Sequence, residues 1–186
     1  MRNERSIEPA STLLRAAGKD ELIRTRRRNH EPVRVGKDVI YVRDQAPLHE
    51  GNMRLPGGYS FAAFIENLNS RVFFWPGTAS GPISYGIRHF ERYETERPVI
   101  VRVSSRDLFD ANQDVEPELC KYNSGSPRCS FGQKSPRGPN TFVDAPRFDG
   151  TPSNVVEVTF RSRIKLPISA QIGSSPSGPW QALLVN

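Results

Sequence analysis

The chain has 186 residues, 36% of them hydrophobic and 25% charged, a composition typical of one globular domain and not of a membrane span or a collagen-like repeat. Lys and Arg number 26 against 20 Asp and Glu, so the net charge of +6 favours an anionic partner such as a nucleic acid or a phosphorylated cofactor, although a solvated basic surface accounts for it equally well. With 14 Gly and 16 Pro, we expect many turns and at least one long loop.

The length predicts a single domain over 1–186. The polar residues at the start contain no apolar stretch, so the sequence predicts no signal peptide and no membrane anchor, and it favours a cytoplasmic protein. Cys120 and Cys129 are then expected to be reduced, although their spacing would also suit a small disulfide loop in a secreted chain. Within the domain we expect an N-terminal helical part at 7–29, a core at 39–170, a long loop at 122–152 and a C-terminal tail at 171–186.

The first predicted element is a helix over 7–29, with an interrupted apolar stripe that Gly18 breaks. A basic cluster closes it, and positive charge suits the C-terminal end of a helix. The same cluster could instead contact the phosphates of a nucleic acid. Its members are Arg24, Arg26, Arg27 and Arg28.

Alternating or β-branched runs predict strands at 39–42, 71–75, 99–103 and 155–160. Phe61, Phe64, Ile65 and Leu68 have the i, i+3, i+4, i+7 spacing of an amphipathic helix, which we expect over 59–68. A second helix is expected at 83–93, and Ser104 or Ser105 is expected to cap a short one that follows. Because strands and helices mix without regular βαβ alternation, the fold class is predicted as α+β.

Periodicity disappears between 122 and 152, where Gly, Pro, Ser and Asn cluster. Loops of this length inside a compact domain are usually functional or disordered. This loop carries few acids and several hydrogen-bond donors, so it is a candidate for function.

No cofactor motif is present: the sequence has no P-loop, no dinucleotide-binding glycine pattern and no nucleophile elbow. His30, His49 and His89 are scattered and neither cysteine has a partner at metal-ligand spacing, so no metal site is expected.

Two features of the strands remain as candidates for chemistry. Alternation places Glu157 on the opposite strand face from Val156 and Val158, where its carboxylate either sits in solvent beside Arg161 or Arg163, or lines a cleft. The rings of Phe73 and Phe74 either belong to the core or stack on a planar group such as a base or nicotinamide.

Five motifs occur in order along the chain: RDQAPL at 43–48, LNSRVFFW at 68–75, NSG at 123–125, RGPNTF at 137–142 and VEV at 156–158. Their order and spacing resemble a bacterial family of uncharacterised domains, over residues 7 to 170. That family has no established activity to carry over. Its layout is similar, more remotely, to the DarT-type DNA ADP-ribosyltransferase toxins, which have an early aromatic strand and a catalytic glutamate on a late strand.

The second resemblance implies small mixed sheets with flanking helices, ADP-ribosyltransferase-like, with NAD as substrate in a cleft between two small sheets and no metal. It implies a transferase that is a toxin or defence effector, with Glu157 as catalytic carboxylate, because cleavage of the nicotinamide–ribose bond develops positive charge on the sugar. The cofactor-binding candidates are Arg43 and Arg137 for phosphates, Phe73 and Phe74 for nicotinamide, and Asn123 and Ser124 for orienting hydrogen bonds.

Proteins of both groups begin with a strand that carries a histidine or arginine of the NAD site, whereas only Arg2 and Arg5 precede the matching region here. The resemblance therefore implies either an upstream strand or an incomplete site. The alternative function is a non-catalytic nucleic-acid or nucleotide binding module that uses the basic cluster at 24–28.

Overall fold

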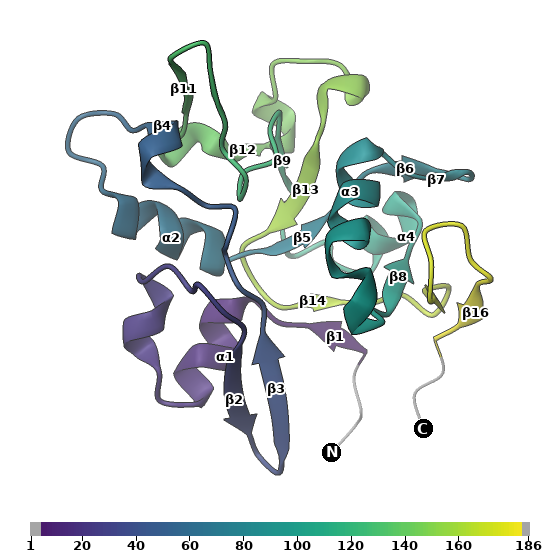
Figure 1. Cartoon of the computed structure of the whole chain (residues 1–186). Coiled ribbons are helices and arrows are strands. Elements are labelled where there is room, and N and C mark those ends of the chain that lie inside the picture. Colours follow the sequence, from purple (N-terminus) through teal and green to yellow (C-terminus); the bar gives the residue numbers. More distant parts are fainter. Residues whose placement is uncertain (1–4, 184–186) are drawn as a thin grey trace.

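The computed structural model describes residues 5–183 and contains small sheets of two to four strands with a few helices (Figure 1). The α+β prediction and the small mixed sheets are therefore confirmed. Arg2 and the end of the expected C-terminal tail lie outside the described residues. The α-helices are α1 (Ala10–Ala16), α2 (Phe61–Asn69), α3 (Ser84–Tyr93) and α4 (Ser105–Asp110).

The strands are short, most of them two or three residues long. They are β1 (Ser6–Ile7), β2 (Glu31–Val35), β3 (Asp38–Val42), β4 (Met53–Arg54), β5 (Val72–Phe74), β6 (Gly77–Thr78), β7 (Gly81–Pro82), β8 (Ile100–Arg102), β9 (Glu118–Cys120), β10 (Cys129–Ser130), β11 (Gln133–Pro136), β12 (Val143–Asp144), β13 (Glu157–Phe160), β14 (Ile164–Lys165), β15 (Gln171–Gly173) and β16 (Gln181–Ala182).

The largest sheet is antiparallel and has the order β12-β9-β13-β5. Residues directly opposite in such a sheet point to the same face, so Glu157 shares a face with its partner Cys120. That face packs on α2, since Cys120 belongs to one hydrophobic cluster with Phe64 and Ile65. The opposite face packs Phe160 on Leu108 of α4.

The two amphipathic helices form where the sequence predicts them. Helix α2 begins one residue after Ser60, whose hydroxyl accepts a hydrogen bond from the Ala63 amide and caps the helix. Its apolar side buries Phe64, Ile65 and Leu68. Helix α3 lies within the expected 83–93, and Ser104 caps α4 as expected.

The helical part predicted over 7–29 is shorter in the structure. Helix α1 ends at Ala16 because Gly18 adopts a left-handed backbone with φ of +68°. A 3₁₀ turn follows at Asp20–Ile23, and the basic cluster lies beyond it, outside any helix. The sequence also failed to predict β2, which pairs along its full length with the predicted strand β3.

The 122–152 loop is more ordered than the sequence predicts. It contains β10, β11 and β12 together with 3₁₀ turns at Pro139–Thr141 and Ala145–Arg147. Strand β11 pairs in parallel with β4 and so brings the loop against the region before α2. No helix within residues 5–183 has the length and apolar character needed to cross a membrane.

Candidate functional site

The carboxylate of Glu157 lies inside the protein, at the first residue of β13. The side chain is 3% exposed, so the alternative of a solvated glutamate beside Arg161 or Arg163 is wrong. Those arginines pair elsewhere, Arg161 with Glu118 and Arg163 with Glu8. Glu157 and Thr159 are both buried, and the register with β9 places them on the same face of β13.

Only one oxygen of this carboxylate is engaged. Oε1 accepts a hydrogen bond from the Ser124 amide at 3.1 Å. Oε2 and the Ser124 hydroxyl are buried and make no hydrogen bond of good geometry within residues 5–183, although the Ser124 side chain lies near enough to this carboxylate to lower its pKa. Burial raises the pKa of Glu157 to about 7, against the smaller lowering effects of Ser124 and Arg137. The group therefore changes its protonation state near neutral pH.

Arg137 holds the NSG turn next to this carboxylate. Its guanidinium donates to the carbonyl oxygens of Asn123 (2.9 Å), Ser124 (3.4 Å) and Pro136 (2.8 Å) and stacks over the Tyr122 ring at 4.7 Å. The structure thus brings together four of the candidate site residues: Glu157, Asn123, Ser124 and Arg137. Asn123 takes part through its carbonyl group, and Ser124 through its amide and carbonyl groups and through the effect of its side chain on the pKa of Glu157.

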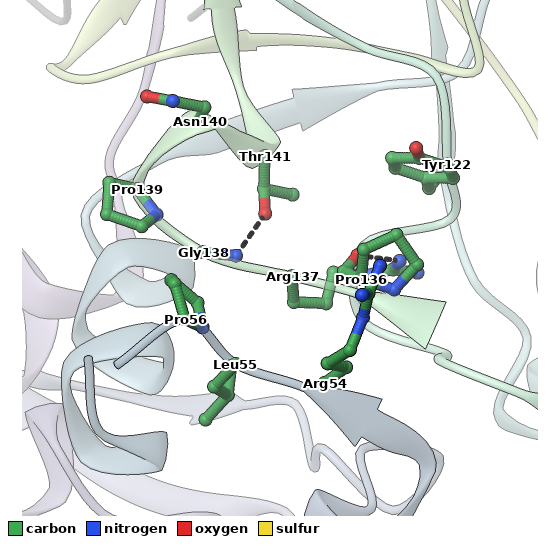
Figure 2. A pocket seen from close by; sticks show the side chains of 10 residues that line it. All are labelled: Arg54, Leu55, Pro56, Tyr122, Pro136, Arg137, Gly138, Pro139, Asn140 and Thr141. Carbon is green, nitrogen blue, oxygen red and sulfur yellow. Dashed lines mark hydrogen bonds between the residues drawn. The ribbon is translucent and has the colours of Figure 1, made fainter. Parts of the chain in front are cut away.

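A pocket of about 410 Å³ lies beside this group, between β4 and the segment that follows β11 (Figure 2). Arg137 and Tyr122 line the pocket, and Arg54 and Pro56 lie on the side of β4. Glu157 is not among the lining residues; it connects to the pocket through Ser124 and Arg137. Two arginines at one cavity make it suitable for an anionic group.

A buried ion cluster that the sequence did not predict lies on the same sheet face. Arg71, whose side chain is fully buried, donates to both carboxylate oxygens of Glu118 at 2.9 and 3.0 Å, and Arg161 donates to the same carboxylate at 3.0 Å. Burial lowers the pKa of Arg71 and the hydrogen bonds of Glu118 oppose this. The cluster ties β9 to the start of β5 and to the end of β13.

The two aromatic candidates differ in position. Phe74 is half-buried and packs edge-on against Phe160 in the core. Phe73 is 38% exposed and lies edge-on to Phe142, opposite Thr159 and so on the sheet face of Glu157. Neither ring lines the 410 Å³ pocket.

Arg43 belongs to a different part of the fold. Its guanidinium lies 3.9 Å from the centre of the Tyr93 ring and 3.5 Å from the Glu96 carboxylate. Its motif neighbours have structural contacts: Asp44 accepts from the Ala46 amide, and Gln45 hydrogen-bonds both Arg27 and Asn69. The structure therefore does not join Arg43 to the group around Glu157.

The four arginines at 24–28 do not form one exposed basic surface. Arg24 pairs with Glu66 at 3.3 Å, and Arg26 donates to the carbonyls of Gln45 and Ala46. Arg27 is 7% exposed and donates to the Arg43 carbonyl and the Asn69 side chain. Arg28 alone of the four has no hydrogen bond or ion pair within the described residues, and it lines a second pocket.

Within residues 5–183, no three His, Cys, Asp or Glu side chains gather as a metal site would require, and both cysteines are free thiols.

The model of a family of unknown function, DUF7002, matches residues 2–169. Neither the curated proteins nor the solved structures contain a significant match to the chain.

Proposed function

The chain belongs to DUF7002, a family of unknown function, and we propose that it cleaves the nicotinamide–ribose bond of NAD and transfers ADP-ribose, with Glu157 as the catalytic carboxylate. The proposal places the chain among ADP-ribosyltransferase-like folds. Glu157 lies on the four-stranded sheet, and the neighbouring pocket is bounded by β4 and β11 of a second sheet.

One observation carries the proposal: the buried oxygen Oε2 of Glu157, which makes no hydrogen bond of good geometry within residues 5–183. Buried polar atoms nearly always have a partner in native proteins, so an orphaned carboxylate oxygen suits a site that a ligand completes. A ribose hydroxyl is a donor that could supply it. A carboxylate fixed on a strand also stabilises the positive charge that develops at the anomeric carbon.

In the proposed reaction the bond between ribose C1′ and the nicotinamide nitrogen breaks, and its electron pair leaves with nicotinamide. The nucleophilic atom of the acceptor, or water, then bonds to C1′ and releases its proton. Glu157 accepts that proton, which its raised pKa of about 7 permits near neutral pH. Because Glu157 does not line the pocket, NAD reaches Oε2 only when the 123–125 turn moves aside.

The test is nicotinamide release from NAD by the full chain, measured by chromatography. We expect Glu157→Gln to abolish release, and the wild-type rate to rise with pH through about 7 as the carboxylate ionises. The matched control is Glu116→Gln, which changes an exposed carboxylate and should keep the wild-type rate. If the wild type releases no nicotinamide and NAD does not raise its melting temperature, the proposal fails.

The binding module based on the 24–28 cluster receives less support. The guanidinium groups of Arg26 and Arg27 donate to backbone carbonyls and to Asn69. The cluster therefore has fewer guanidinium groups available to contact a phosphate than its sequence suggests. A salt-dependent affinity for nucleic acid that is lost on replacing Arg24 and Arg28 would favour it over the enzyme.

A further inference from the structure

We propose that the second pocket, of about 300 Å³, is a binding site for a phosphate group. It lies where the segment 28–30, the segment after β3 and the C-terminal end of α3 meet. The side chains that matter are those of Arg28, His30, Asp44, Arg92 and Tyr93. No residue lines both pockets, so the proposal does not depend on the chemistry of Glu157.

The carboxylates near this pocket are already engaged. Asp44 lies 3.3 Å from Nδ1 of His30 and accepts hydrogen bonds from the Tyr93 hydroxyl (3.3 Å) and the Ala46 amide (2.7 Å). Glu96 lies 3.2 Å from Nε2 of His30 and 3.5 Å from the Arg43 guanidinium. Both acidic charges therefore have cationic or donor partners within this cluster.

The two arginines that line this pocket have no such partners. Arg28 and Arg92 line the pocket, are exposed, and make no hydrogen bond or ion pair within residues 5–183. The one carboxylate that lines the pocket, that of Asp44, is engaged by His30, Tyr93 and the Ala46 amide, so these two guanidinium groups add positive charge that no ion pair offsets. Nη1 of Arg43, which stacks on Tyr93 at the same cluster, is also buried without a hydrogen-bond partner within the described residues.

The chemistry favours a phosphate over a planar ring. Guanidinium groups match phosphate oxygens in two-point contacts, and a dianionic phosphate balances two arginines. Arg43 lies over the Tyr93 ring and His30 and His89 pack near it, so the pocket has little open aromatic face for a base to stack on. The phosphate could belong to a free nucleotide or to the end of a nucleic acid strand.

The test is titration calorimetry with inorganic phosphate at constant ionic strength. We expect the wild type to bind phosphate. The double variant Arg28→Gln/Arg92→Gln should bind it with an affinity reduced by about tenfold or more, because the phosphate loses a charge-assisted hydrogen bond from each arginine. The matched control is Arg106→Gln/Arg128→Gln. It removes the same charge from two exposed arginines whose side chains also have no hydrogen bond or ion pair within residues 5–183, and it should bind like the wild type.

Neither double variant removes a hydrogen bond or an ion pair of the described residues, so both should unfold close to the wild-type temperature. Equal loss of phosphate binding in the two double variants, or no binding by the wild type, would overturn the proposal. Two further ligands distinguish the sources of the phosphate. If a nucleoside monophosphate binds more tightly than inorganic phosphate, the source is a free nucleotide. If a 5′-phosphorylated oligonucleotide binds more tightly than its 5′-hydroxyl form, the source is a strand end.

Discussion

Burial controls the chemistry of individual residues on the Glu157 face of the sheet. The carboxyl group of Glu157 and the thiol of Cys120 lie opposite each other on β13 and β9, and both have pKa values raised chiefly by desolvation. The negative charge of Glu157 further raises the pKa of Cys120. Both groups are therefore held in their neutral forms over a wider pH range than in solution.

The raised pKa of Glu157 predicts a pH-dependent stability. The folded chain keeps this proton up to about pH 7, whereas the unfolded chain loses it near 4.5, so the free energy of unfolding falls as pH rises between these values. Glu157→Gln removes the effect. Its stability should equal that of the wild type near pH 4 and exceed it by on the order of 3 kcal/mol above pH 7. Urea unfolding measures this, and parallel pH curves for the two proteins would contradict it.

The two thiols should differ in reactivity. Cys120 is fully buried with its pKa raised to about 12, whereas Cys129 is exposed. Because the thiolate is the nucleophile, an alkylating reagent should modify one cysteine in the folded chain and both in denaturant. Peptide mass spectrometry identifies the modified residue. Rapid modification of Cys120 in the folded chain would show that the sheet face opens.

At the scale of secondary-structure elements, the sequence predicts the helices and strands that are long enough to show a residue pattern. Helix α2 is predicted because its apolar residues recur at helical spacing, and β13 because most of its residues are β-branched or aromatic. Strands β10 and β12 have two residues each, too few to form a pattern. Alternation gave the face of Glu157 but not its burial, which depends on a turn more than thirty residues earlier in the chain.

The ion cluster on β9 illustrates the same limit and carries a prediction. Glu118 and Arg71 are 47 residues apart, so only the strand order brings them together. Glu118→Gln leaves the fully buried Arg71 without its counter-charge and should lower the free energy of unfolding by about 3 kcal/mol. Glu116→Gln, two residues earlier and exposed, should change it by less than about 0.5 kcal/mol.

Denaturant unfolding compares these two variants. An apolar pair, Arg71→Met with Glu118→Leu, should recover much of the loss because no buried charge then remains unpaired. A loss in Glu118→Gln no larger than in Glu116→Gln would show that Arg71 reaches solvent in the folded chain.

On the scale of the molecule, the buried hydrophobic residues within 5–183 form three clusters. The N-terminal one joins Leu14 of α1 to Val33 of β2, in a part of the fold that lies away from the four-stranded sheet (Figure 1). A buried polar network at Asn69, the last residue of α2, connects this part to the rest. Its side chain donates to the Ile23 carbonyl at 2.8 Å and accepts from Arg27 at 3.0 Å.

Asn69→Ala should therefore destabilise the β2-β3 hairpin more than the four-stranded sheet. The substitution removes the partner of the Arg27 guanidinium and of the Ile23 carbonyl. We expect the free energy of unfolding to fall by about 2 to 3 kcal/mol. Amide hydrogen exchange should become faster in β2 and β3 than in β9 and β13, because the central sheet keeps its own contacts. Asn67→Ala, on the same helix, removes a hydrogen bond of Arg71 beside the central sheet instead, so it should leave exchange in β2 and β3 at the wild-type rate. Equal acceleration in both regions would mean that the three clusters unfold as one unit.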